Sequence, residues 1–553
     1  MLSGVRTLGS ARAQWVLRSS VTQYKVLLPR GARMQSSMSG AQRSDDIRVL
    51  GSSYNRDKWT NATPAILEKT GRDLLHHPSH PLAILKELIF KEFPTFAHYD
   101  NISPVVSTYQ NFDSLGFSKD HPGRSVTDTY YINQNTLLRT HTSAHQLQLL
   151  AAGKKGDSEL LALARNSSAS PRNERFLVAA DVYRRDEIDA SHYPVFHQME
   201  GVCTFSRAEI RKHIRDRDIA ASTKSSTSEN GSVAKLLDTT VIGDANPVQP
   251  EHLEEEAAFL ADHMKQMMNN MVVQILTKAV AAQKSAGDAD MAGSQTEFPV
   301  RWIDAFFPFT SPSWEMEVLF QGEWLEICGC GVMKQNILED AGMTDRIGWA
   351  FGFGLERLAM LLFGIPDIRL FWSSDPRFTG QFAPGQITTF KPFSRHPACT
   401  KDVSFWLPES SEFHENDLMD MVREIAGDLV EGVKLIDSFT HPKTGKASRC
   451  YRINYCSMDR NVTNEEINAI QEQRQLNVLF QMKELIRRQN KMSIIEAIND
   501  PENSDAQDKM RLYILYMLVN KGLKQANRDE CKAALRVVGC NLTALEHINQ
   551  IDS

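Results

Sequence analysis

Two arginines that lie far apart in the chain have surroundings suited to phosphate binding. Arg184 comes at the end of an expected strand and is followed directly by Arg185. Successive side chains of a strand point to opposite faces, so one of the two can enter a site. A guanidinium group can hold a phosphate through two parallel hydrogen bonds. The alternative is a surface salt bridge, which is the commoner role of two adjacent arginines.

Arg357 has a different setting, because it follows Gly352 and Gly354. Glycines let a ligand approach the backbone closely. Arg357 would then lie in the first turn of a helix, whose N-terminal end favours anions. The spacing of the glycines matches neither the Rossmann nor the P-loop pattern. We therefore regard both Arg184 and Arg357 as candidate phosphate ligands.

A second group of side chains could hold an amino acid. Ser143, Gln198 and Glu200 offer a hydroxyl, an amide and a carboxylate, the groups needed to bind an ammonium ion. Gln198 and Glu200 are two residues apart on an expected strand and can face one cavity. Phe307 and Phe309 have the same spacing and could form walls around a ring. The alternative is that these phenylalanines belong to the core.

Two further chemistries are not favoured. His141 and His145 have the spacing of two metal ligands on a helix, but no Glu follows His141 and no third ligand is apparent. The sequence also suggests no serine or cysteine nucleophile with a partnering base.

The elements that must position these residues are mostly strands. Alternating and aromatic-rich stretches predict strands at 105–109, 130–132, 176–183, 195–205, 301–309, 315–320 and 324–329. Helices are predicted at 80–93, at 251–283 and directly after Gly354, and the Ser-rich stretch 222–232 is predicted to be a surface insertion. This pattern favours an α+β fold with an antiparallel sheet flanked by helices over a doubly wound parallel sheet.

A second unit is expected to begin near Lys391. Strands are predicted at 401–407, 433–440 and 448–457, with a helix at 415–430 and another from near Thr463. That order is a ferredoxin-like βαββα series lacking only its last strand. The remainder, from Gln475 to Ser553, is predicted to be helical and charged.

Length and composition bound the possibilities. A chain of 553 residues is too long for one core and suggests two or three domains. The net charge of −6 gives no global attraction to nucleic acid, so any RNA contact must use local basic patches. No apolar run approaches the roughly 18 residues of a membrane-spanning helix, and we expect no membrane partner. The eight scattered cysteines suit reduced, structural roles in a reducing compartment.

Residues 1–44 differ from the rest of the chain. They contain no Asp or Glu, while arginines are spread among serines. This composition is typical of a mitochondrial transit peptide, and we expect cleavage before Asp45. A disordered basic tail is the alternative.

Several of these segments together resemble a known family. The stretch from about His80 to Phe382 resembles the catalytic core of class II aminoacyl-tRNA synthetases, specifically phenylalanyl-tRNA synthetases of the single-chain mitochondrial type. The resemblance is carried by residues 111–113, 121–122, 139–146, 183–200, 306–312, 323–333 and 346–372. Residues 391 to about 473 are similar to the family's anticodon-binding domain.

The resemblance implies a domain organisation and a reaction. The expected domains are a transit peptide at 1–44, a catalytic domain at 45–385 with an insertion at about 206–297, a ferredoxin-like anticodon-binding domain at 386–475, and a helical extension at 476–553. The reaction would join L-phenylalanine to tRNA(Phe) through a phenylalanyl-adenylate, using ATP and Mg²⁺. A monomer in the mitochondrial matrix is implied.

The resemblance also assigns roles to residues. Arg184 and Arg357 would be catalytic, and ATP would be bound by Arg184, Asp186, His192 and Arg357. The amino acid would be held by His141, Ser143, Gln146, Gln198 and Glu200, with its ring among Phe307, Phe309 and Ala350. Glu326 is the candidate ligand for Mg²⁺.

The C-terminal tail departs from this pattern. Residues 491–550 resemble a helical piece of SM-family (syntaxin-binding) vesicle-fusion regulators, and a misjoined gene model would explain a fragment of that kind. Two other functions therefore stay open at this point. One is a synthetase-like protein that activates an amino acid for another acceptor, which charging of tRNA in vitro would test. The other is a trafficking adaptor defined by the tail, which deletion of residues 476–553 would test.

Overall fold

A computed structural model gives the arrangement of most of the chain. It describes residues 46–166, 173–221, 234–285, 298–320, 322–392, 398–407, 413–442, 445–457 and 460–470. The expected transit peptide at 1–44, the Ser-rich insertion at 222–232 and the extension at 476–553 lie outside these ranges. No helix of the described part is both long and apolar enough to cross a membrane.

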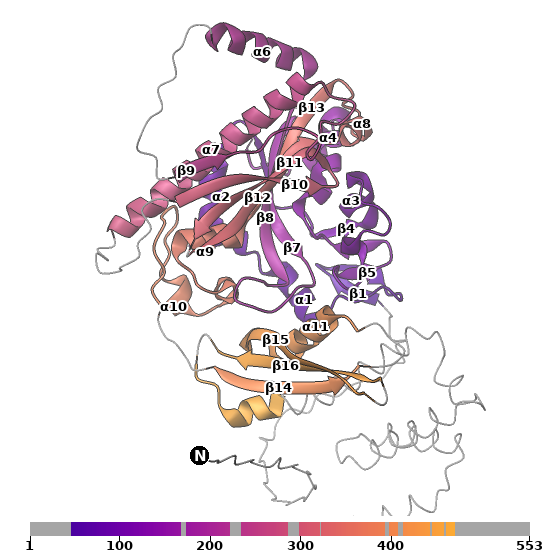
Figure 1. Cartoon of the computed structure of the whole chain (residues 1–553), viewed down its shortest axis with the longest axis vertical. Helices are drawn as coiled ribbons and strands as arrows, with labels where there is room; N and C mark the ends of the chain where they lie inside the picture. Colours follow the sequence, from indigo (N-terminus) through magenta and orange to yellow (C-terminus); the bar gives the residue numbers. More distant parts are fainter. Residues whose placement is uncertain are drawn as a thin grey trace, which may run out of the picture. The chain divides into compact units, whose positions relative to one another are not determined.

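An eight-stranded sheet forms the centre of the first domain (Figure 1). Its strands, in spatial order, are β3 (Ala97–Tyr99), β7 (Arg175–Tyr183), β8 (Val195–Ser206), β13 (Arg346–Gly354), β12 (Glu323–Met333), β11 (Thr310–Phe320), β10 (Phe298–Phe307) and β9 (Ala234–Asp238). The inner neighbours pair antiparallel, and only the two edge strands β3 and β9 pair parallel to theirs. The predicted antiparallel sheet with flanking helices is therefore confirmed.

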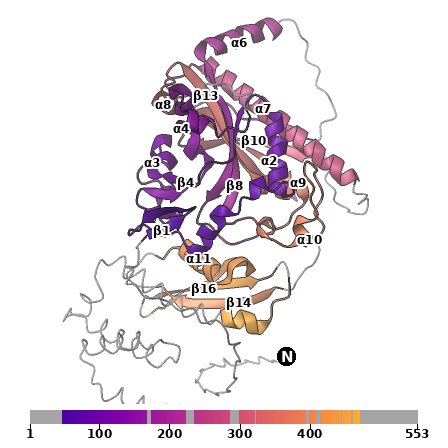
Figure 2. The same ribbon diagram turned by 180° about the vertical axis from the view of Figure 1, so that it is seen from behind.

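Helices cover both faces of this sheet (Figure 2). On one face α2 (Pro81–Glu92), α7 (Glu254–Ser285) and α9 (Leu355–Phe363) share a core with Leu177, Ala179 and Met199 of the sheet. On the other face α4 (Gln146–Lys155) and α8 (Gln335–Asp340) share a second core with Phe176, Val178 and Val202. Strand residues thus alternate between two cores, as the pleat requires. Met264, Met268 and Met271 of α7 are buried in the first core, and Met267 is partly buried against it.

The remaining helices and strands of the first domain, apart from the 15-residue helix α6, are short. They are β1 (Asp46–Val49), β2 (Ser52–Asn55), α1 (Pro64–Leu67), β4 (Val105–Ser107), α3 (Thr108–Asn111), β5 (Tyr131–Asn133), β6 (Thr136–Leu138), α5 (Ser158–Leu161), α6 (Arg207–Ala221) and α10 (Pro376–Thr379).

Two sequence predictions were wrong in detail. The expected strand at 105–109 ends at Ser107, because Ser107 caps the N-terminus of α3. Its hydroxyl accepts from the backbone N–H of Gln110, and its own backbone N–H donates to the side-chain oxygen of Gln110. No strand was predicted for the glycine-rich segment before α9, but this segment is the central strand β13. Its glycines hide the strand signal, since glycine is uncommon in strands.

The second domain has a three-stranded antiparallel sheet in the order β14 (Cys399–Trp406), β16 (Ala447–Tyr455), β15 (Val430–Thr440). One face of it packs on α11 (Glu415–Ala426) and on the helical residues 464–470, through a core that includes Val422, Tyr451 and Ile467. This is the predicted βαββα order.

Candidate active site

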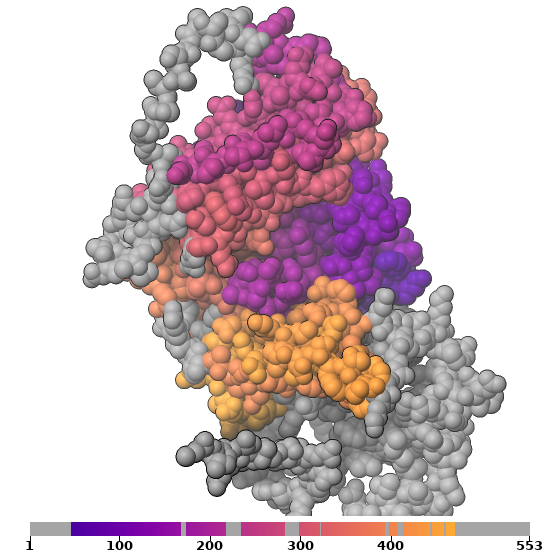
Figure 3. Space-filling model, in the orientation of Figure 1, coloured from indigo at the N-terminus to yellow at the C-terminus, as the bar shows by residue number. Residues whose placement is uncertain are grey.

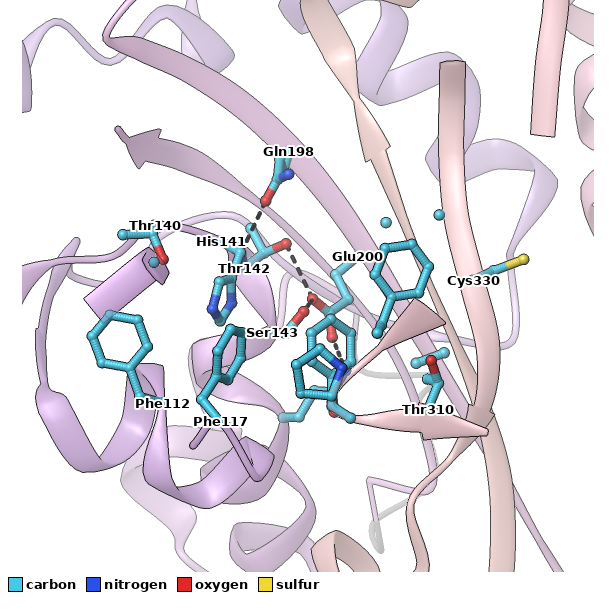
Figure 4. Close-up of a pocket in the computed structure, with 18 of the residues that line it drawn as sticks. Phe112, Phe117, Thr140, His141, Thr142, Ser143, Gln198, Glu200, Thr310 and Cys330 are labelled. Atoms are coloured by element: carbon cyan, nitrogen blue, oxygen red, sulfur yellow. Dashed lines mark hydrogen bonds between the residues drawn. The ribbon is translucent and has the colours of Figure 1, made fainter. Parts of the chain in front are cut away.

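A cavity of about 440 Å³ opens on the sheet face that carries the second core. It is lined by ten of the thirteen predicted site residues: His141, Ser143, Gln146, Arg184, Gln198, Glu200, Phe307, Phe309, Glu326 and Ala350. Figure 4 shows the carboxylate of Glu200 near the middle of the group, with hydroxyl and amide groups beside it and aromatic rings around it. Three segments that are distant in sequence therefore meet at one place.

Glu200 is the centre of the polar part of the cavity. Its carboxylate accepts hydrogen bonds from the hydroxyls of Ser143 at 2.5 Å and Thr142 at 3.2 Å, and from the amide of Gln146. Gln198 lies two residues away on β8, and its side-chain oxygen accepts from the backbone N–H of Thr142 at 3.2 Å. Gln198 and Glu200 share one face of the strand, as their spacing predicted.

The charge of Glu200 is strongly affected by its surroundings. Its side chain is 2% exposed. Burial raises the pKa of the Glu200 carboxyl to about 7, although the hydrogen bonds from Ser143, Gln146 and Thr142 act in the opposite direction. A cation that enters the cavity would favour the ionised form, so this carboxylate is suited to bind an ammonium group.

Aromatic rings form the apolar part of the cavity. The ring of Phe307 at the end of β10 lies 5.8 Å from that of Phe309, which follows it in the turn to β11. Phe117 lies 6.0 Å from Phe309 and stacks on His141 at 5.7 Å with an interplanar angle of 4°. These separations are in the range of favourable ring contacts.

His141 and His145 differ in their position relative to the cavity. Burial, with a smaller contribution from Arg184, lowers the pKa of His141 to about 3, so its ring is neutral in the cavity. His145 does not line the cavity but lies within hydrogen-bond distance of Arg139 and Gln148, at 2.9 and 2.8 Å.

Small residues of β12 and β13 form the floor. Ala350 is 3% exposed and pairs with Gly331 in the register of the sheet. A Cβ added at Gly329 would lie 2.7 Å from the ring of Phe307, so glycine is required there for the ring to take its place. A Cβ added at Gly352 would meet nothing within 4 Å, and the backbone of β13 is therefore open towards the cavity.

Arg184 lies at the polar end of the cavity. Its Nε donates to the carbonyl oxygen of Thr140 at 2.8 Å, and its guanidinium carbon lies 5.2 Å from the centre of the Phe196 ring. Burial lowers the pKa of Arg184, with Asp186 and Glu326 acting against this. The neighbouring Arg185 points the other way, into the second domain, as the alternation of side chains predicted.

Arg357 lies beyond the cavity wall, at the third position of α9, as expected for the first turn of a helix. Its Nη1 is 3.4 Å from a carboxylate oxygen of Glu326, and the two side chains are 34% and 47% exposed. Glu315 lies near Glu326, since burial and the charges of Glu326 and Glu317 raise the pKa of Glu315. Among the described residues, however, no group of three or more His, Cys, Asp or Glu side chains is arranged to hold a metal ion by itself.

Asp186 and His192 also lie outside the cavity lining. Both are in the loop between β7 and β8, and both interact electrostatically with other proposed site residues. Asp186 interacts with Arg184, and His192 interacts with Arg357. Three further residues of the site were not identified from the sequence: Thr142, Phe117 and Phe196. Only Thr142 had a signal, because it lies between two residues that were identified.

Two parts of the chain match known protein families. Residues 68–214 and 287–382 match the family "tRNA synthetases class II core domain (F)". Residues 394–486 match the "Ferredoxin-fold anticodon binding domain".

Three relatives are similar to this chain over most of their own length. The mitochondrial phenylalanine–tRNA ligase of Saccharomyces cerevisiae is 48% identical over 77% of this chain and 92% of that protein. The mitochondrial phenylalanine–tRNA ligase of Mus musculus is 42% identical over 81% of this chain and 90% of that protein. The chloroplastic/mitochondrial phenylalanine–tRNA ligase of Arabidopsis thaliana is 42% identical over 75% of this chain and 80% of that protein. The chain belongs to the phenylalanine–tRNA ligase family, with a class II synthetase core followed by a ferredoxin-fold anticodon-binding domain.

Proposed function

We propose that this chain joins L-phenylalanine to tRNA(Phe) in mitochondria through a phenylalanyl-adenylate. The observation that carries the proposal is the single cavity in which Glu200 and its donors lie between an aromatic enclosure and Arg184. An amino acid with a benzyl side chain fits this cavity. Its ammonium group can meet Glu200, its ring the aromatic enclosure, and its carboxylate the end at Arg184.

The amino acid is held by its charged and apolar ends. The ammonium group is bound by Glu200, with Ser143, Gln146 and Gln198 beside it, and the neutral His141 lines the same space. The ring enters between Phe307, Phe309 and Ala350. A phenolic hydroxyl would have to displace this apolar lining or remain without a hydrogen-bond partner, so tyrosine binds less well.

The reaction then proceeds by positioning and charge neutralisation. A carboxylate oxygen of phenylalanine attacks the α-phosphorus of ATP, and pyrophosphate leaves. In the second step a ribose hydroxyl of the terminal adenosine attacks the carbonyl carbon, and AMP leaves. Arg184 neutralises the α-phosphate and Arg357 the outer phosphates, with Asp186 and His192 at the nucleotide.

Glu326 would hold the Mg²⁺ that accompanies ATP. The ion would neutralise phosphate charge, and Glu326 is half-exposed and could supply one oxygen ligand, with the phosphates of ATP supplying others. Glu326 also pairs with Arg357.

The rest of the chain supplies targeting and RNA binding. We assign residues 1–44 to a transit peptide, 45–385 to the catalytic domain and 386–475 to the anticodon-binding domain. The enzyme would act as a monomer in the matrix, because one chain carries both a catalytic and an RNA-binding domain.

Phenylalanine-dependent ATP–pyrophosphate exchange tests the proposal. Arg184→Ala and Arg357→Ala should each lower exchange by about 100-fold or more, the loss typical of removing one group that neutralises transition-state charge. Circular dichroism should show that both variants remain folded. Arg452→Ala is the matched control, since Arg452 pairs with Asp402 on the second domain. Exchange near the wild-type rate in either active-site variant would refute that residue's role.

A further inference from the structure

The loop between β7 and β8, residues 184–194, carries three of the proposed nucleotide ligands: Arg184, Asp186 and His192. It contains no helix or strand. Its backbone carbonyl groups must therefore find hydrogen-bond partners outside a regular element. In this structure the carbonyl groups in the middle of the loop accept hydrogen bonds from the second domain.

Four successive carbonyl oxygens of the loop accept from that domain. The donors lie on α11 and β15. Asn416 Nδ2 donates to Arg185 O at 3.1 Å, Arg423 Nη2 donates to both Asp186 O and Glu187 O, and Val433 N donates to Ile188 O at 3.0 Å. Figure 3 shows the orange second domain against the purple part of the first domain.

Side chains of the loop are also buried in the second domain. Ile188 is 6% exposed and belongs to the apolar core formed with Val422 and Ile453. Arg185 is 9% exposed and makes ion pairs with Asp417 at 2.7 Å and with Asp420 at 2.5 Å.

The ends of the loop are held by the first domain instead. Arg184 N donates to Pro194 O at 3.0 Å, and Ile368 N donates to Ala190 O at 2.9 Å. The ends are therefore fixed by the sheet and its neighbours, and Arg185 N also donates to Asp128 O of the first domain at 2.9 Å. The carbonyl oxygens of residues 185–188, by contrast, are held by the second domain. A change in the conformation of residues 185–188 would move Asp186, which lies within this segment, and would be transmitted to Arg184, which directly precedes it.

We propose that the second domain is a structural part of the nucleotide site, in which Asn416 and Arg423 are positioning residues for the loop that carries Arg184 and Asp186. Amino-acid activation, which needs no RNA, then depends on a domain whose family is defined by RNA binding. This inference rests on the proposed function.

The test is ATP–pyrophosphate exchange by the full chain without RNA. Arg423→Ala and Asn416→Ala should each raise the KM for ATP by about five- to tenfold, the factor expected for one or two lost hydrogen bonds. The KM for phenylalanine should stay unchanged, because Glu200 and the aromatic enclosure are on other elements. Arg423→Lys keeps a charged donor and should restore part of the ATP affinity. Arg452→Ala, on the same domain but paired with Asp402, should behave as wild type.

Three outcomes would overturn the inference. The KM for ATP could stay at the wild-type value in both variants, or the two substrates' KM values could rise together. Arg452→Ala could also reproduce the effect, which would indicate a general loss of stability. Thermal unfolding of every variant identifies that case. Ile188→Val, which leaves the hydrogen bonds intact, is a milder second probe of the same loop. Failure of the proposed function itself is distinguishable, because the wild-type chain would then show no phenylalanine-dependent exchange.

Discussion

At the scale of single residues, Glu200 combines a charge with almost complete burial. Its carboxyl has a pKa of about 7 because burial disfavours the ionised form. The bound ammonium group of an amino acid favours that form. Affinity for the ligand is therefore linked to the proton on Glu200.

We expect the dissociation constant of L-phenylalanine, measured by calorimetry without ATP, to rise as the pH falls below 7. The rise should approach tenfold for each pH unit, since binding must then displace a proton. Phenylalaninol keeps the ammonium group and should show the same dependence. 3-Phenylpropionate lacks it and should not. An equal pH profile for all three ligands would contradict the role given to Glu200.

The ligand-free protein should show the linked effect on stability. The folded pKa of Glu200 lies above the value of about 4.3 expected in an unfolded chain. The folded state therefore binds more protons between these values and loses stability as the pH rises through them. Glu200→Gln removes this cost, so it should be more stable than wild type at pH 8 and not at pH 4.

At the scale of elements, the floor of the cavity depends on two neighbouring strands. Ala350 on β13 and Gly329 on β12 limit the space near Phe307. Ala350→Gly should admit para-substituted phenylalanines, because it removes a methyl group from the lining. Gly329→Ala should do the opposite and raise the KM for phenylalanine itself, because its Cβ would displace Phe307. ATP–pyrophosphate exchange measured with a series of para-substituted phenylalanines checks both predictions. Substrate profiles identical to that of the wild type would contradict the placement of Ala350 and Gly329 at the floor of the cavity.

The sequence allowed the strands with alternating patterns to be predicted, and with them the shared face of Gln198 and Glu200. It did not reveal β13, because Gly348, Gly352 and Gly354 carry no side chain to show a period of two. The partners of the strands were also not predictable. Pairing of β13 with β8 joins segments about 150 residues apart and depends on packing, not on local pattern.

At the scale of the whole molecule, the two domains meet through charged groups that are removed from water. Asp420 accepts from Tyr130 at 2.6 Å and from Arg185 at 2.5 Å, and Arg423 lies 3.4 Å from it. Asp420 and Arg185 are each 9% exposed or less in their side chains. Buried pairs of this kind are costly to break, because the remaining charge stays buried.

Arg185→Ala should therefore lower the free energy of unfolding by about 3 kcal/mol. Arg452→Ala breaks an Arg–Asp pair whose side chains are 48% and 43% exposed, and should cost less than about 1 kcal/mol. Urea unfolding of both variants measures the difference, and adding Asp420→Ala completes a cycle that isolates the coupling between Arg185 and Asp420. Equal costs for Arg185→Ala and Arg452→Ala would mean that water reaches the contact between the domains. The carbonyls of residues 185–188 could then bind water in place of Asn416 and Arg423, and the second domain would no longer be needed to shape the nucleotide site.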